Sequence, residues 1–138
     1  MAAEWLPKML QTGAILALDR REAGPPARPA ASVRIIKAIG LAQDRAPGLT
    51  LTQFLVFMAV AGEEGIRLYE LCDRIGESQA VISRTVRALT PAGEPGTLPP
   101  AHGLLTLMRD RHDGRGRRAA LSPAGRTLLG QIEHAMES

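Results

Sequence analysis

Apolar residues recur with helical spacing at the start of the chain, and a proline-rich run then interrupts them. Residues 2–21 carry leucine, isoleucine and methionine near the 3.6-residue helical period, which predicts an N-terminal helix. Residues 22–31 contain three prolines and a glycine, a composition typical of a linker. We therefore expect a helical arm at residues 1–21, a linker at residues 22–31, and a compact domain at residues 32–138.

Two apolar helices are expected in the first part of that domain. Ser32 is the expected N-cap of a helix that runs to about Arg45, and the sequence Ala46–Gly48 ends it. Thr50 and Gln53 form the pattern of a capping box and predict the start of the next helix. That helix is apolar most of the way round, as expected for one at the centre of a small domain.

A pair of short helices follows a two-residue strand expected at residues 66–67. The first helix is predicted over residues 68–75, and a tight turn at residues 76–78 leads to the second over residues 79–89. The second helix is apolar on its inward face, and its polar, basic outward face carries Gln79, Ser83, Arg84 and Arg87. This is the plan of a helix-turn-helix, whose second helix lies in the major groove of DNA. The alternative is an ordinary helix pair with a solvated outer face.

The segment at residues 103–122 predicts a β-hairpin. Leu105 and Leu107 alternate with their neighbours, and Asp113–Gly114 is a strong hairpin-turn signal. A basic hairpin that follows a recognition helix is a wing, whose tip can reach an adjacent minor groove. A final helix is expected from Pro123. The predicted fold is therefore mainly α with a small β-hairpin wing, a winged helix-turn-helix.

Charge supports this interpretation by its distribution more than by its total. The net charge is only +3, but 15 of the 17 basic residues are arginine, and five arginines fall between Arg109 and Arg118. A local arginine cluster is typical of a nucleic-acid binder, although a solvated hairpin tip would look the same. Aromatic residues make up 3% of the chain, which argues against single-strand binding by base stacking.

Other chemistry finds little support in the sequence. Cys72 is the single cysteine, so no disulfide can form within the chain; it fits a buried position better than a redox sensor. Three scattered histidines give no metal-ligand spacing, and there is no phosphate loop or nucleophile elbow. No apolar run is long enough to span a membrane, and no signal peptide is recognisable. We expect a cytoplasmic protein that is not an enzyme and needs no cofactor.

The order of these elements resembles the MarR family of bacterial regulators over about residues 49–131. Residues 68–89 resemble the helix-turn-helix of that family, and residues 103–129 resemble its wing and following helix. The most specific part is the Asp-x-Arg pattern of Asp113 and Arg115 together with the LSPAG run at residues 121–125. The resemblance implies a winged-helix regulator that binds double-stranded DNA, and a homodimer.

The resemblance also implies roles for individual residues. Arg115 matches a wing-tip arginine that enters the minor groove, and Asp113 matches the acid that steadies it. Positions of the recognition helix that meet bases or phosphates correspond to Ser78, Gln79, Ser83, Arg84 and Arg87. The wing residues Arg111, His112 and Arg117 complete the expected DNA-binding set.

Three features depart from the family pattern. Residues 90–102 separate the recognition helix from the wing with an insertion that contains four prolines, expected to be stiff and exposed. The C-terminal dimerisation helices are expected to be short, and the arm at residues 1–21 is joined through the proline-rich linker. The arm could replace lost dimer contacts, whereas the insertion could touch DNA, touch a partner, or be a tolerated surface loop.

Three functions remain compatible with these patterns. The first is a sequence-specific transcriptional regulator with its recognition helix in the major groove and its arginine-rich wing in the minor groove. The second is an architectural DNA-binding protein with low sequence specificity. The third is a winged-helix module that binds another protein. The patterns favour the first, and they identify no small-molecule effector.

Overall fold

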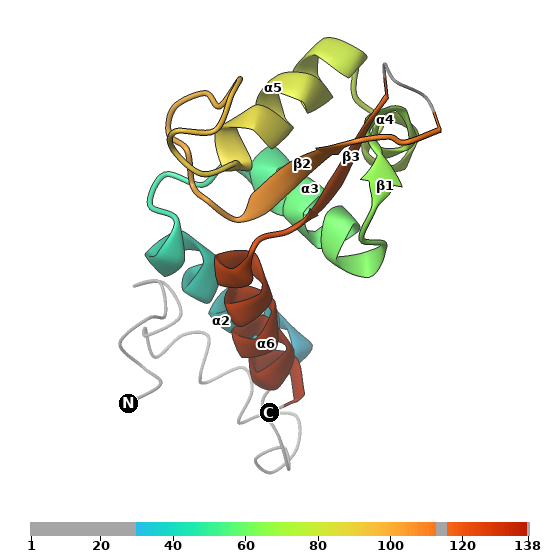
Figure 1. Ribbon diagram of the computed structural model, residues 1–138. Coiled ribbons are helices and arrows are strands. Elements are labelled where there is room, and N and C mark those ends of the chain that lie inside the picture. The colour runs from blue at the N-terminus through green and yellow to red at the C-terminus, as the bar shows by residue number, and fades with distance from the viewer. Residues whose placement is uncertain (1–29, 113–115, 138) are drawn as a thin grey trace, which may run out of the picture. The chain divides into compact units, whose positions relative to one another are not determined.

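The computed structural model describes residues 30–112 and 116–137, so the expected arm at residues 1–21 and most of the linker lie outside the described residues. The mainly α winged helix-turn-helix expected from the sequence is confirmed. The described elements follow the order α2 (Ala31–Arg45), α3 (Leu51–Gly62), β1 (Ile66–Arg67), α4 (Leu68–Ile75), α5 (Gln79–Leu89), β2 (Leu105–Arg109), β3 (Arg117–Leu121) and α6 (Pro123–Glu137) (Figure 1).

The described chain divides into two compact units. One contains residues 30–45 and 130–137, and the other contains residues 46–129. Helix α6 begins in the second unit and ends in the first. The second unit holds the whole helix-turn-helix and the hairpin, so it contains every described candidate DNA-binding residue.

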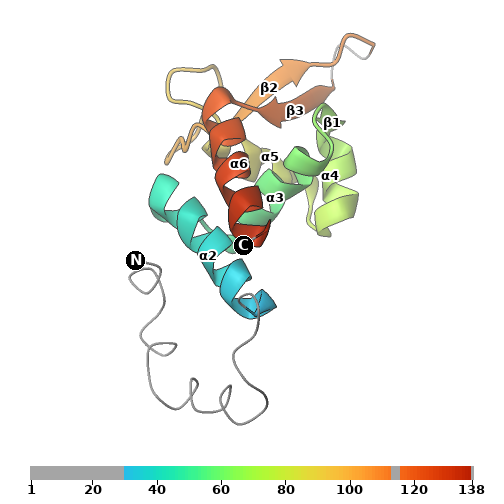
Figure 2. The ribbon, with the colours of Figure 1, turned by 90° about the horizontal axis from the view of Figure 1, so that it is seen from below.

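The sheet of the second unit has three antiparallel strands in the order β1-β3-β2. Strands β2 and β3 form the predicted hairpin, in which Leu105 pairs with Leu121 and Arg109 pairs with Arg117. The short strand β1 adds to the other edge of β3, where Ile66 faces Ala119. Figure 2 shows β2 and β3 side by side, with β1 at the other edge of β3.

The start of α3 follows the predicted capping box. The backbone N–H of Gln53 donates to the Thr50 hydroxyl at 3.1 Å, and the backbone N–H of Thr50 donates to Gln53 Oε1 at 2.9 Å. The predicted N-cap at Ser32 is wrong, because α2 begins at Ala31, two residues earlier than a cap at Ser32 predicts, and Ser32 lies in its first turn. The carbonyl of Ala30 accepts the N–H of Arg34 at 3.2 Å and so begins the helical pattern before Ser32.

The turn between α4 and α5 is set by two local signals. Gly76 adopts a left-handed conformation at φ 79°, which ends α4 and lets its N–H donate to the carbonyl of Cys72 at 2.8 Å. Ser78 then accepts the N–H of Val81 at 3.2 Å and begins α5. These two caps fix the direction in which α5 leaves the turn.

The core of the second unit is almost entirely aliphatic. Its largest aromatic member is Phe57 of α3, which is fully buried. Helix α5 contributes three residues at i, i+4 and i+7 that are each 0% exposed, namely Ile82, Val86 and Leu89. Burial of such side chains stabilises a fold by about 1.5–3 kcal/mol each, so the inward face of α5 is held firmly. The opposite face is thereby directed outward.

The insertion at residues 90–102 is anchored to the end of α5. Its middle, residues 92–96, is exposed as expected, but Thr90 and His102 at its two ends are buried. Pro91 and His102 form a β-bridge that closes the loop at its base. The N–H groups of Leu98 and His102 donate at 3.0 Å to the carbonyls of Arg87 and Ala88. The loop therefore satisfies carbonyls that a helix end leaves without partners.

Candidate nucleic-acid interface

The outer face of α5 presents the predicted recognition-helix residues. Ser78, Gln79 and Arg84 are exposed, while Ser83 and Arg87 are half-buried. Ser83, Arg84 and Arg87 point away from the side of the helix that Ile82, Val86 and Leu89 bury in the core. Ser78 and Gln79 lie exposed at the N-terminal end of the helix, so all five predicted residues are at least partly exposed.

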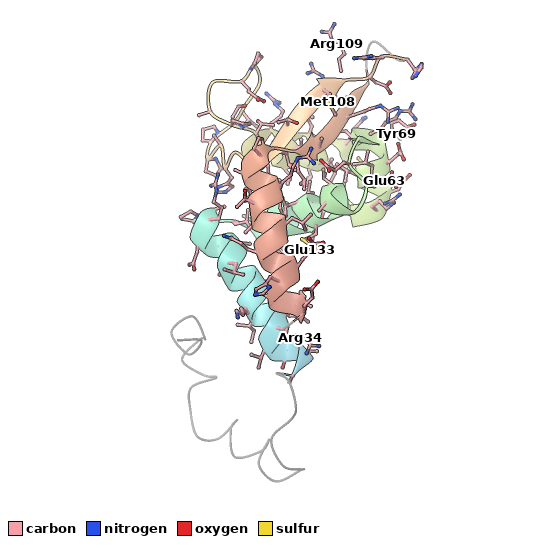
Figure 3. The ribbon with its side chains drawn as sticks, turned by 60° about the horizontal axis from the view of Figure 1, so that its bottom comes forward. Arg34, Glu63, Tyr69, Met108, Arg109 and Glu133 are labelled. Atoms are coloured by element: carbon pink, nitrogen blue, oxygen red, sulfur yellow. The ribbon has the colours of Figure 1, made fainter. Side chains whose placement is uncertain are left out.

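The hairpin presents the second group of predicted residues. Arg117 is exposed at the start of β3, and Arg111 and His112 are exposed just beyond the end of β2. Asp113 and Arg115, to which the family resemblance gave the wing-tip roles, lie outside the described residues. Figure 3 shows Arg109 and Met108 at the outer end of β2. Arg109 is also exposed, although it was not in the predicted set.

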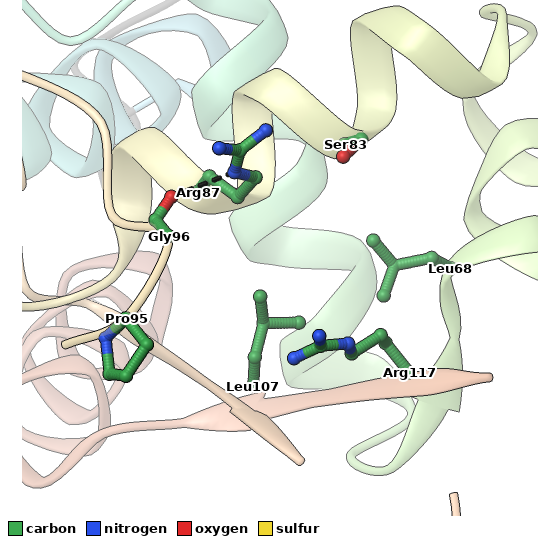
Figure 4. A pocket seen from close by; sticks show the side chains of 7 residues that line it. All are labelled: Leu68, Ser83, Arg87, Pro95, Gly96, Leu107 and Arg117. Carbon is green, nitrogen blue, oxygen red and sulfur yellow. Dashed lines mark hydrogen bonds between the residues drawn. The ribbon is translucent and has the colours of Figure 1, made fainter. Parts of the chain in front are cut away.

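A groove lies between α5 and the hairpin. Its first cavity, of about 280 Å³, is lined by Ser83 and Arg87 of α5 on one side and by Leu107 and Arg117 of the hairpin on the other (Figure 4). A second cavity, of about 240 Å³, is lined by Gln79 together with Ser83 and Arg117, so the two cavities adjoin. We call this surface the helix–wing groove; its lining residues are Leu68, Tyr69, Gln79, Ser83, Arg87, Pro95, Gly96, Leu107, Gly116 and Arg117.

A buried carboxylate fixes the base of the wing. Asp110 has a side chain only 1% exposed, and it accepts Arg67 Nε at 2.7 Å and the N–H of His112 at 3.0 Å. Arg118 Nη2 lies 3.4 Å from the same carboxylate. The hydrogen bond from Arg67 lowers the pKa of Asp110 well below its usual range, with help from the backbone of His112. Asp110 therefore ties the hairpin to the strand that precedes α4.

Asp110 and Tyr69 were not predicted from the sequence. The Asp-x-Arg pattern favoured Asp113, whereas the shortest ion pair of Asp110 is with Arg67, which is 43 positions away in the chain. Tyr69, near the start of α4, is 55% exposed and lines the groove. Its hydroxyl accepts Arg67 Nη1 at 3.3 Å, and its ring is shown in Figure 3 beside the hairpin. The unusual exposure of the only tyrosine could not be predicted from its helical position.

The arginines of the second unit fall into two classes. In the first class a carboxylate or a backbone carbonyl holds the guanidinium, as for Arg67, Arg74, Arg87, Arg118 and Arg126. In the second class no hydrogen bond or ion pair occurs within the described chain, as for Arg84, Arg109, Arg111 and Arg117. All four members of the second class lie on α5 or the hairpin. Within the described residues, the arginines without a partner therefore lie on α5 and the hairpin, and one of them, Arg117, lines the helix–wing groove.

A redox-active thiol and a metal site are the other functions for which the sequence was tested. Cys72 is half-buried in α4, and its thiol donates to the carbonyl of Leu68 at 3.5 Å. Within residues 30–112 and 116–137, no three His, Cys, Asp or Glu side chains gather in a way that could hold a metal ion. No described helix is long and apolar enough to cross a membrane.

Comparison with known proteins gives structural neighbours only. No protein-family model matches the chain, and no curated protein matches its sequence. Transcriptional regulator Tm0710 from Thermotoga maritima is 17% identical with a TM-score of 0.62, over 91% of this chain and 75% of that one.

Two further structures have the same fold. A MarR transcriptional regulator from Methanosarcina mazei is 19% identical with a TM-score of 0.57, over 95% of this chain and 76% of that one. MepR from S. aureus, solved in a complex with DNA, is 12% identical with a TM-score of 0.60, over 91% of this chain and 82% of that one. At these identities the likeness shows a shared fold.

Proposed function

We propose that this chain, which has the winged-helix fold of the MarR-type regulators, is a transcriptional regulator that binds duplex DNA through the helix–wing groove. The observation that carries the proposal is a group of four arginines on α5 and the hairpin, Arg84, Arg109, Arg111 and Arg117, that make no hydrogen bond or ion pair with another described residue. An exposed guanidinium without an acidic partner is available to a phosphate or a guanine edge. The proposed action is binding, without catalysis or a cofactor.

Helix α5 supplies the major-groove contacts in this proposal. An α-helix fits the major groove of B-DNA, and residues of its N-terminal half come nearest to the base edges. Gln79 and Ser83 can donate and accept hydrogen bonds there, and Arg84 is exposed beside them. The Ser78 hydroxyl caps α5, and in this proposal Ser78 also contacts DNA from the N-terminal end of the helix.

The groove itself suits the sugar–phosphate backbone. Arg87 and Arg117 line its first cavity from opposite elements, so a phosphate between them would meet a guanidinium from each side. Tyr69 and Ser83 add hydroxyl groups to the lining of the second cavity. Contacts of this kind position a protein on DNA without reading its sequence.

The wing supplies the minor-groove contact in this proposal. Arg109, Arg111 and His112 are exposed where the hairpin approaches its tip, and Asp110 holds the base of the hairpin in place. A narrow minor groove has a strong negative potential that favours arginine. Arg115 and Asp113 lie outside the described residues, and in this proposal they keep the roles that the family resemblance gives them.

We further propose that the regulator acts as a homodimer in the cytoplasm. The first unit leaves large apolar side chains exposed, with Ile35 of α2 at 48% and Met136 of α6 at 41%. Covering them with a second copy would remove apolar surface from water. In this proposal residues 32–138 of each copy form one DNA-binding domain, into which the loop at residues 90–102 is inserted.

Selection of bound fragments from the genome of the source organism tests the function. The purified chain is expected to retain a small set of duplexes at low salt. Replacing Arg84 or Arg117 with alanine should weaken binding by roughly 1–3 kcal/mol where the contact is specific. Arg126→Ala is the matched control, because Arg126 is held by Glu64 and does not line the groove.

The outcomes separate the alternatives. Failure of the unmodified chain to bind any duplex at low salt would refute the proposal. Equal affinity for random and selected duplexes would indicate an architectural protein instead. Full activity in the organism after loss of both Arg84 and Arg117 would indicate a module that binds another protein.

A further inference from the structure

The exposed tip of the insertion reaches the helix–wing groove. Pro95 and Gly96 line the first cavity together with Arg87 and Arg117 (Figure 4). The carbonyl of Gly96 accepts Arg87 Nε at 2.7 Å. The loop is thus in direct contact with one of the two arginines that line this cavity, Arg87 of α5 and Arg117 of the hairpin.

The loop tip is itself held in one conformation. The hydroxyls of Thr90 and Thr97 are 2.6 Å apart, and the Thr97 hydroxyl donates to the carbonyl of Pro91 at 2.9 Å. Gly96 has a φ of +82°, a conformation that glycine adopts without strain and that other residues rarely adopt. The carbonyl that receives Arg87 is therefore fixed in place relative to the end of α5.

Arg87 keeps its remaining donors available. Its only hydrogen bond to another described residue runs from Nε, so both Nη nitrogens are left for a ligand. A free arginine side chain must lose much of its rotational freedom when it binds a phosphate. A side chain already held at Nε has lost part of that freedom before DNA arrives.

We propose that the insertion is a positioning element of the DNA-binding surface, in which the Gly96 carbonyl holds Arg87 ready to contact a backbone phosphate. This inference rests on the proposed DNA-binding function. In this inference the loop at residues 90–102 raises the affinity for DNA by holding Arg87, and the loop does not itself contact DNA. Gly96 is the positioning residue, and Arg87 is the residue that binds.

Valine substitutions at two glycines test the proposal. Gly96→Val places a β-branched residue at φ +82° and should displace the carbonyl that Arg87 uses. Gly93→Val is the matched control, because Gly93 has a similar φ of +93° in the same loop, a Cβ there would meet nothing within 4 Å, and Arg87 Nε donates to Gly96. Where Gly96→Val reduces folding, Thr97→Val loosens the same tip by removing the two hydroxyl contacts. Thermal unfolding of every variant reports on the fold.

Each loop substitution is combined with Arg87→Ala, and affinity for the selected duplex is measured over a range of salt. Gly96→Val should weaken binding roughly 2- to 10-fold when Arg87 is present, the range expected for freeing one long side chain. It should leave the salt slope unchanged, because the phosphate contact is still made. Arg87→Ala should make the slope less steep by about 0.9, and Gly96→Val should then cause no further loss.

Other results would overturn the inference in distinguishable ways. Equal weakening by Gly96→Val with and without Arg87 would show that the loop acts on DNA by itself. Equal weakening by Gly93→Val and Gly96→Val would show a general effect of loop strain. Absence of duplex binding by the unmodified chain would instead refute the proposed function on which the inference rests.

Discussion

Replacing Arg117 with alanine should weaken duplex binding and reduce its dependence on salt. Arg117 is exposed at the start of β3, lines both cavities of the groove, and has no hydrogen bond or ion pair within the described residues. A guanidinium in that position is expected to neutralise one phosphate. Neutralising a phosphate releases condensed counterions, and this release makes the affinity depend on salt.

The size of the effect follows from the number of candidate phosphate-binding arginines on α5 and the hairpin. Each phosphate contact contributes about −0.9 to the slope of log K against log salt, so five arginines set a limit of roughly −4.5 per chain. The five are Arg84, Arg87, Arg109, Arg111 and Arg117. Losing Arg117 should make the slope less steep by about 0.9. The ratio of the affinity of the unmodified chain to that of the variant should therefore fall roughly 3.5-fold when the salt concentration rises from about 50 to about 200 mM.

Fluorescence anisotropy of a labelled duplex at several salt concentrations measures this slope. Arg126→Ala is the control, because it removes the same charge from a side chain 59% exposed whose Nη1 lies 3.0 Å from Glu64 Oε2. The control should leave the slope unchanged. An equal change of slope in both variants would refute the reasoning, since it would show that net charge matters and the position in the groove does not.

Three further predictions concern the fold that carries the groove. Gly125→Ala should lower the free energy of unfolding, measured by urea denaturation, by about 1–3 kcal/mol, because a Cβ there would clash with the Leu104 carbonyl. Gly130→Ala is the control in the same helix: a Cβ there would meet no atom within 4 Å, and the substitution should raise the free energy of unfolding by up to about 1 kcal/mol. Ser78→Ala should cost about 1 kcal/mol in the same assay through loss of the α5 cap. The lowered pKa of Asp110 stabilises the fold above its unfolded pKa of about 3.9, and this contribution is lost as the pH falls through the native pKa. The unfolding free energy should therefore fall more steeply below about pH 4 in the unmodified chain than in Asp110→Asn; equal slopes would contradict this.

The helix-turn-helix could be predicted because its signals are local. The capping box of Thr50 and Gln53, the turn glycine Gly76 and the cap at Ser78 each act within a few residues, so the sequence displays them directly. The start of α2 was misplaced by two residues because a serine near a helix start need not be the cap.

The features that escaped prediction depend on long-range contacts. Asp110 matters because Arg67 lies beside it in space although 43 positions away in the chain. The insertion at residues 90–102 looked like a surface loop because proline-rich sequence carries no periodicity. Its hydrogen bonds to the carbonyls of Arg87 and Ala88 become visible only when the end of α5 is in place.

The adjacent residues Arg117 and Arg118 show that arginines of one cluster differ in whether another described residue holds their guanidinium group. They follow one another in β3, and successive side chains of a strand point to opposite faces of the sheet. Arg118 is held by the Gly65 carbonyl at 2.8 Å and by Asp110, whereas Arg117 lines the groove on the other face. Two residues of the same type and charge therefore have different roles: Arg118 stabilises the wing, and Arg117, in our proposal, binds DNA. The count of arginines overstates the charge available to DNA, and the alternation of β3 decides which of them face it.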